Sequence, residues 1–248
     1  MKKKLIILFA IIFLFTFIIE IDASFNVTPN RFIFNIDQPT TEVLEITNNS
    51  NSPQRIRVYP GMADGQAEEH YLGEWLVIHP PVFTIEPGDT RGVRFSVRPP
   101  DDLADGEYRS LLYIEELALE DDIAEEQEGV DFQLLTKLGI NLYGKYGDID
   151  YDGELTEVEV DNTETGLEAS GNFINQSNAH LRMEAVMRVI DNQGEIVKED
   201  NMRFVVHRDD EKGYEQLIET DDDLSGYQLE VSFQLSDEVV AEYSTTID

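Results

Sequence analysis

Apolar and polar residues alternate along many short segments of this chain. Ile56 and Val58 alternate with arginines, and the same two-residue period runs through 93–97 and 227–235. Successive side chains of a strand point to opposite faces, so this period places one face in a core and the other in water. The pattern therefore predicts antiparallel sheets that are buried on one face. Beyond the N-terminal apolar run, no long stretch has a convincing helical period.

Clusters of Asn, Asp, Gly, Pro and Ser separate the predicted strands. Short strands divided by such turns are typical of β-sandwiches, so the chain is expected to be all-β. The clusters lie at 48–53, 87–89, 105–106, 191–194 and 221–223.

Composition divides the chain into two domains behind an N-terminal segment. All nine prolines lie between Pro29 and Pro100, and a Tyr- and Gly-rich stretch at 143–147 precedes a new series of predicted strands. The predicted domains are residues 24–146 and 147–248, both of ordinary domain size.

The N-terminal segment has the pattern of a secretory signal peptide. Lys2, Lys3 and Lys4 precede an apolar run from Leu5 to Ile19, which is shorter than a membrane-spanning helix requires. Residues 1–23 are therefore predicted to be a signal peptide, and the protein is expected to be exported. The alternative is an uncleaved segment that anchors the protein in the envelope, which would be its only association with a membrane.

The mature chain is strongly acidic. The sequence has 51 Asp and Glu against 18 Lys and Arg, a formal net charge of −33. Phosphate contacts need basic patches, so this charge argues against a nucleic-acid partner. Apolar residues make up 41% of the chain, more than disordered chains contain. Acidic residues are spread over both predicted domains, which is typical of a surface kept soluble in high salt.

The sequence offers little support for catalysis. It contains no cysteine and none of the nucleophile-elbow, P-loop or dinucleotide-binding motifs, and its four histidines lack metal-ligand spacing. We therefore expect no enzyme activity, small-molecule substrate or cofactor. One motif does match: Asp148 to Glu159 fits the DxDxDG-x5-E calcium loop, although strands rather than helices flank it. Calcium binding and a solvated acidic linker both remain open for this segment.

Five segments, in the same order, resemble a known family. Residues 24–143 are similar to the N-terminal domain of the PapD-like periplasmic pilus-assembly chaperones, which implies an immunoglobulin-like sandwich. Parts of the remaining chain, such as 172–181 and 224–231, resemble a second small sandwich of the same type. The segments that carry the first resemblance are Phe25–Phe34, Leu44–Asn51, Pro80–Gly88, Gly92–Ser96 and Tyr108–Leu117.

The resemblance implies that the protein holds secreted subunits by strand addition. In this family the last strand of the first domain donates alternating apolar side chains to a subunit that lacks a strand. The matching positions here are Val130, Phe132 and Leu134. Backbone hydrogen bonds would set the register, and alternate side chains would enter the groove of the partner. The alternative is that these residues face the core of their own domain.

The family also anchors a subunit carboxylate with an arginine and a lysine. Arg31 matches the arginine, whereas Gly139 occupies the lysine position. Lys137 lies two residues earlier on the same strand face and is the expected substitute. An arginine alternating into a strand faces either solvent or a bound anion.

These patterns together predict a periplasmic chaperone for pilus, fimbrial or other surface-fibre subunits. The resemblance implies such subunits as partners and an outer-membrane usher as a further one. The rival interpretations are an envelope or cell-surface binding module built from the same sandwiches and a calcium-dependent structural protein.

Overall fold

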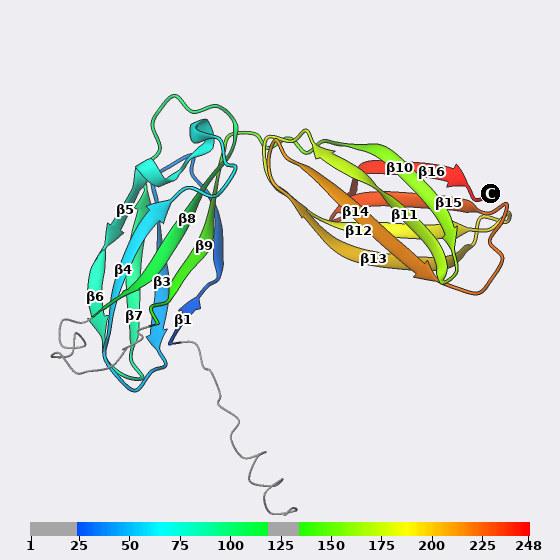
Figure 1. Ribbon diagram of the computed structural model, residues 1–248. Coiled ribbons are helices and arrows are strands. Elements are labelled where there is room, and N and C mark those ends of the chain that lie inside the picture. The colour runs from blue at the N-terminus through cyan, green and yellow to red at the C-terminus, as the bar shows by residue number, and fades with distance from the viewer. Residues whose placement is uncertain (1–23, 119–133) are drawn as a thin grey trace, which may run out of the picture.

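The computed structural model describes residues 24–118 and 134–248. These residues form two β-sandwiches joined at one end, with long axes that run in different directions (Figure 1). The prediction of an all-β chain with two immunoglobulin-like sandwiches is confirmed. The predicted signal peptide and the positions Val130 and Phe132 lie outside the described residues. Within the described part of the chain, no helix has the length and apolar character to cross a membrane.

The first sandwich packs a four-stranded sheet against a five-stranded sheet. Two short 3-10 helices, η1 (Glu68–His70) and η2 (Gly73–Trp75), lie in the connection between β4 and β5. In spatial order, the smaller sheet contains β1 (Phe25–Thr28), β3 (Thr40–Asn48), β7 (Thr90–Val97) and β5 (Leu76–His79). The larger sheet contains β2 (Arg31–Asn35), β9 (Lys137–Tyr146), β8 (Gly106–Leu117), β4 (Gln54–Gly61) and β6 (Val82–Ile85).

Alternation along each strand builds the first core. Val93, Phe95 and Val97 of β7 are buried, whereas the residues between them face outward. Phe32 of β2 meets Phe95 edge to face, with ring centroids 4.9 Å apart, so this pair joins the two sheets. Such aromatic contacts add to the burial of apolar area that stabilises the sandwich.

The N-terminal strands pass from one sheet to the other. β1 pairs antiparallel with β3 in the smaller sheet, and β2 pairs parallel with β9 in the larger sheet. The β2 register begins with Arg31 opposite Asn141, whereas β8 pairs with β9 from Lys137 onward. Among the described residues, no strand therefore pairs with the outer edge of 137–140.

The second sandwich has a four-stranded and a three-stranded sheet. Its core is centred on Phe173, Phe204 and Phe233, whose ring centroids lie 4.9 to 5.7 Å apart. In spatial order, the four-stranded sheet contains β13 (Ile196–Val206), β12 (Leu181–Ile190), β15 (Gln228–Leu235) and β16 (Glu238–Thr246). The three-stranded sheet contains β10 (Gly153–Thr163), β11 (Gly166–Asn175) and β14 (Glu211–Glu219).

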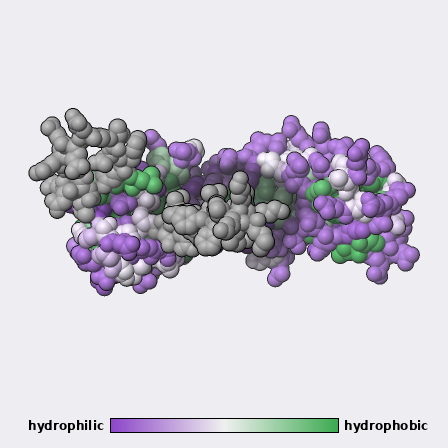
Figure 2. Space-filling model, turned by 60° about the horizontal axis from the view of Figure 1, so that its bottom comes forward, coloured by the Kyte–Doolittle hydropathy of each residue, from purple (hydrophilic) through white to green (hydrophobic). Residues whose placement is uncertain are grey.

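The surface reflects the acidic composition. On the face that Figure 2 shows, the parts not drawn in grey are mostly hydrophilic, with small separate apolar areas among them. Since acidic residues are spread along both domains of the sequence, repulsion among them is distributed over the two sandwiches and can be screened by salt.

Candidate functional site

Over residues 24–118 and 134–248, the beginning of β9 has no strand along its outer edge, and exposed leucines lie on the strand and just before it. Leu134 is 89% exposed just before the strand, and Leu138 within it is 41% exposed. Leu138 lies opposite buried Ile114 and alternates with buried Ile140, so it points to the interior side of the sheet. An inward-facing leucine that stays exposed indicates that no described residue closes the sandwich at this edge. An unpaired edge of this kind is a template for an added strand.

Lys137 lies at the open end of β9, away from Arg31. Its Nζ is 4.0 Å from the ring centroid of Tyr113 and 5.5 Å from that of Tyr59. A hydrogen bond with Tyr59 is the largest cause that raises the pKa of Lys137. Because Arg31 is opposite Asn141, four residues further along β9, about 13 Å of strand separates the two positions. The structure does not bring the two predicted basic residues together.

Gly139, at the position of the family lysine, faces an aromatic ring. A Cβ atom on this glycine would lie 3.2 Å from Cε1 of Tyr113, so the ring occupies the space in front of it. Tyr113 thus fills the place between Lys137 and Asn141 on this face of the sheet.

Arg109 is a basic residue that shares a neighbour, Asn141, with Arg31. It donates two hydrogen bonds to Oδ1 of Asn141, at 3.1 Å from Nε and 2.7 Å from Nη2. Arg31 is the strand neighbour of the same Asn141 on the other side. The sequence analysis missed Arg109, although it lies within one of the segments of the resemblance. Its signal was a single arginine within the strand-forming run Tyr108–Ile114.

Tyr143 is the point around which several arginines gather. Burial raises the pKa of its phenol, whereas the charges of Arg109, Arg31 and Arg182 act to lower it. The guanidinium carbon of Arg109 lies 5.7 Å from the Tyr143 ring centroid. These arginines come from β8, β2 and β12, so both sandwiches contribute. In a chain with a net charge of −33, this is a local positive cluster at the junction.

A buried pair connects the sandwiches beside this cluster. Oε2 of Glu107 on β8 lies 2.6 Å from Nδ1 of His180, and their side chains are 3% and 8% exposed. The His180 backbone amide donates to the other carboxylate oxygen at 3.2 Å. The His180 ring stacks on Tyr143 with centroids 4.1 Å apart. These contacts hold the second sandwich against β8 and β9.

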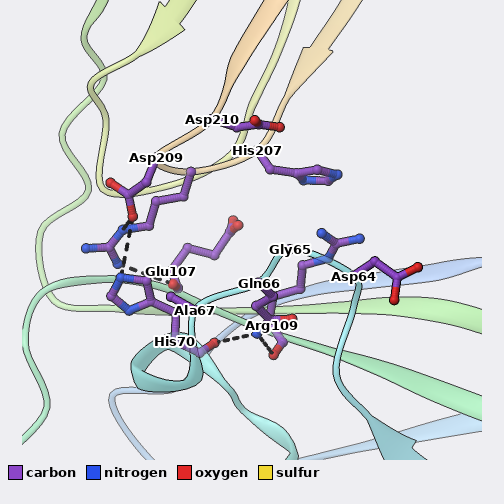
Figure 3. Close-up of a pocket in the computed structure, with 11 residues that line it drawn as sticks. Asp64, Gly65, Gln66, Ala67, His70, Glu107, Arg109, His207, Asp209 and Asp210 are labelled. Atoms are coloured by element: carbon purple, nitrogen blue, oxygen red, sulfur yellow. Dashed lines mark hydrogen bonds and ion pairs between the residues drawn. The ribbon is translucent and has the colours of Figure 1, made fainter.

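A cavity of about 340 Å³ lies between the sandwiches at the same junction. Figure 3 shows the β13–β14 turn of the second sandwich facing β8 and the β4–β5 connection of the first. Gln66 braces this wall by donating to the carbonyl oxygens of His70 and Arg109.

The acidic segment that begins at Asp148 is attached to the second sandwich by hydrogen bonds. The Asp148 carbonyl accepts from Nδ2 of Asn178, and the Asp152 carbonyl accepts from Oγ of Ser177. Over residues 24–118 and 134–248, no group of three or more acidic or histidine side chains is arranged to hold a metal ion. These hydrogen bonds instead attach the segment to the second sandwich.

A family model identifies the first sandwich. Residues 24–143 match the model described as "Pili and flagellar-assembly chaperone, PapD N-terminal domain". The N-terminal domain belongs to the PapD-like chaperone superfamily. This match has the same extent as the resemblance seen in the sequence, and the family is a class of chaperones. No curated protein sequence matches the chain.

Solved PapD-like structures share the two-domain fold at low sequence identity. The E. coli chaperone DraB is 13% identical, with 91% of this chain and 97% of that chain covered and a TM-score of 0.50. The chaperone YadV is 10% identical, with 91% and 100% covered and a TM-score of 0.50. A chain from a chaperone–tip adhesin complex of CFA/I fimbriae is 10% identical, with 91% and 99% covered and a TM-score of 0.51.

Proposed function

We propose that this protein is a periplasmic chaperone that binds secreted pilus, fimbrial or other surface-fibre subunits by strand addition. The observation that carries the proposal is the open edge of β9, where 137–140 pair with β8 alone among the described strands and Leu138 is exposed. A subunit strand added at this edge would gain backbone hydrogen bonds, and its groove would receive apolar side chains.

The donated side chains would be those of Val130, Phe132 and Leu134. Their two-residue spacing puts them on one face of an extended chain that leads into β9. The high exposure of Leu134 supports this role, because a core residue would be buried.

The carboxylate of a bound subunit would be held by Arg31 together with Arg109. Arg109 already has a fixed orientation through Asn141, and Asn141 is next to Arg31 on the sheet. A prepositioned guanidinium group binds a carboxylate with little loss of side-chain entropy. This assignment gives the second basic position to Arg109 rather than to Lys137.

Two further expectations belong to this proposal. The similar chain in the chaperone–tip adhesin complex supports fibre subunits as clients. An outer-membrane usher would be a further partner. Export to the periplasm would place the chaperone where such clients emerge, after removal of the signal peptide.

The test is client capture in the source bacterium. The triple variant Val130→Glu, Phe132→Glu, Leu134→Glu should lose the secreted β-rich subunit that co-purifies with the unchanged protein, as identified by mass spectrometry. Charged side chains cannot enter an apolar groove without a large desolvation cost.

A matched control keeps the number of new charges equal. The variant Ile196→Glu, Val197→Glu, Val239→Glu alters three exposed apolar residues of the second sandwich and should still capture the subunit. Equal capture by both triple variants, or no captured subunit with the unchanged protein, would contradict the proposal.

A further inference from the structure

The first described residue, Ser24, contacts a carboxylate at the end of the first sandwich that is distant from the second (Figure 1). Oγ of Ser24 donates to Oε2 of Glu116 on β8 at 3.2 Å. Ser24 is half-buried, and its carbonyl oxygen accepts from the Asn49 amide. These contacts fix the residue that precedes β1 against the end of β8, although 92 positions separate the two in the chain.

Glu116 accepts hydrogen bonds from three parts of the first sandwich but is not paired with a cation. Besides Ser24, the backbone amide of Thr136 donates to Oε2 and Nε2 of Gln54 donates to Oε1, both at 3.3 Å. None of the ion pairs found within residues 24–118 and 134–248 includes Glu116. A half-buried carboxylate of this kind would be stabilised by a positive charge placed beside it.

Gln54 has an unused acceptor next to this carboxylate. The residue is 3% exposed, and its Oε1 atom is buried without a hydrogen-bond partner in the described part of the chain. Buried acceptors are normally satisfied, so a donor within reach would stabilise this atom. The carboxylate and the amide oxygen together suit a group that is positively charged and has several donors, such as a primary ammonium group.

Removal of the predicted signal peptide would create such a group at this position. Hydrolysis of the bond between Ala23 and Ser24 consumes one water molecule and leaves a carboxylate on Ala23. The nitrogen of Ser24 then becomes an amine that is mostly protonated at pH 7. Three covalent bonds separate this nitrogen from Oγ, which already contacts Glu116, so a local rotation brings the ammonium group to the carboxylate.

We propose that Glu116 and Gln54 form a binding site for the α-ammonium group of Ser24 that signal-peptide removal creates. Because Glu116 also binds the amide of Thr136, the residue before β9, the ion pair fastens the base of β9 only in the processed protein. The nitrogen of an uncut chain is an uncharged amide and cannot form this ion pair. The proposal rests on the export and processing included in the proposed function, and it is independent of strand addition.

Sequencing the N-terminus of the exported protein, purified from its source bacterium, tests the position of cleavage. The first residue should be Ser24. A protein that keeps residues 1–23, or one that begins at another residue, would overturn the proposal. Subunit capture is measured separately, so failure of this proposal is distinguishable from failure of strand addition.

The pH at which the Ser24 amine titrates tests the ion pair. Only the neutral amine reacts with acetic anhydride, so the rate of acetylation across a pH series, followed by mass spectrometry of the N-terminal peptide, gives its pKa. A neighbouring carboxylate stabilises the ammonium form, so this pKa should lie about one pH unit above that of the free peptide Ser-Phe-Asn-Val. Equal values in the folded protein and the peptide would overturn the proposal.

Variants locate the effect at Glu116, the charged group that faces the amine. Its neighbours Glu115 on β8 and Lys137 on β9 lie on the opposite face of the sheet, because side chains alternate along each strand. Glu116→Gln should return the titration of the amine to that of the peptide, whereas Glu242→Gln, at an exposed carboxylate of β16, should not change it. A pKa that stays high in Glu116→Gln would also overturn the proposal. If that variant fails to fold, the comparison of the unchanged protein with the peptide still decides.

Discussion

Glu107 and His180 meet across the boundary of the two sandwiches, with Oε2 2.6 Å from Nδ1. Each belongs to a different sandwich, and 73 residues separate them in the chain. The pair lies beside Tyr143 and the arginines around it, so it positions the candidate carboxylate site as well as the junction. The contact between the sandwiches and the position of Tyr143 beside the arginines are therefore linked through His180.

Glu107→Ala should destabilise the junction by about 3 kcal/mol, because it leaves the buried donors of His180 without their acceptor. Urea unfolding followed by fluorescence measures the change. Glu45→Ala, at an exposed carboxylate of β3, is the control and should change the free energy of unfolding by less than about 0.5 kcal/mol. Equal effects of the two variants would show that the pair does not stabilise the junction.

The second basic position of the carboxylate site can be assigned by three variants. Arg31→Gln and Arg109→Gln should each weaken subunit binding about tenfold, because each removes a charged hydrogen-bond donor. Lys137→Gln should leave affinity nearly unchanged, since Lys137 stacks on Tyr113 at the other end of the strand. Titration calorimetry with the captured subunit gives the affinities. A loss in Lys137→Gln as large as that in Arg31→Gln would restore Lys137 as the anchor.

Tyr214 provides a test of burial in the second core. Its hydroxyl group is buried and has no hydrogen-bond partner within residues 24–118 and 134–248. Tyr214→Phe should therefore raise stability at neutral pH by about 1 kcal/mol, because it removes an unsatisfied polar group. Thermal unfolding of the two proteins checks this, and a less stable variant would reveal a partner for the hydroxyl group.

The same tyrosine predicts a dependence on alkaline pH. Burial raises its pKa from 10.0 to about 12, so the unfolded chain loses this proton first as the pH rises. The folded state consequently loses stability between about pH 10 and 12. Tyr214→Phe should lose less stability than the unchanged protein over this interval, as measured by urea unfolding at each pH. Parallel losses would place the tyrosine in a more solvated environment.

The net charge of −33 predicts stabilisation by salt. Potassium chloride shortens the screening length from about 10 Å at 0.1 M to about 3 Å at 1 M, which reduces repulsion among surface carboxylates. The melting temperature should therefore rise across this series. A melting temperature that stays constant or falls would mean that the acidic surface is not an adaptation to salt.

Local pattern was sufficient for much of the fold. The two-residue period at Val93, Phe95 and Val97 predicts a buried strand face, and these side chains are buried in β7. The order of five weak segments was enough to predict the family of residues 24–143. Both predictions could be made from the sequence, because strand alternation and turn composition depend on residues that are neighbours in the chain.

The candidate site needed contacts that no neighbouring residues determine. Arg31 and Lys137 could both be selected from the sequence, but how far apart they lie depends on strand register, which the sequence alone does not give. The β2–β9 register puts Asn141 beside Arg31, and Arg109 reaches that asparagine from β8. Register arises from the packing of whole strands. Sliding one strand by four residues along its neighbour would give each residue a new cross-strand partner, yet the two-residue alternation of buried and exposed side chains would stay the same.

By itself, the sequence determined an acidic, all-β chain with a PapD-like first domain and an alternating apolar run before β9, because these features follow from composition and local period. Only the tertiary structure decided that 137–140 of β9 pair with β8 alone among the described strands, and that Arg109 and Arg31 both neighbour Asn141. It also decided that three histidines scattered in the sequence, His70, His180 and His207, gather at the junction. Those arrangements depend on strand register and on the docking of two domains, which act between residues far apart in the chain.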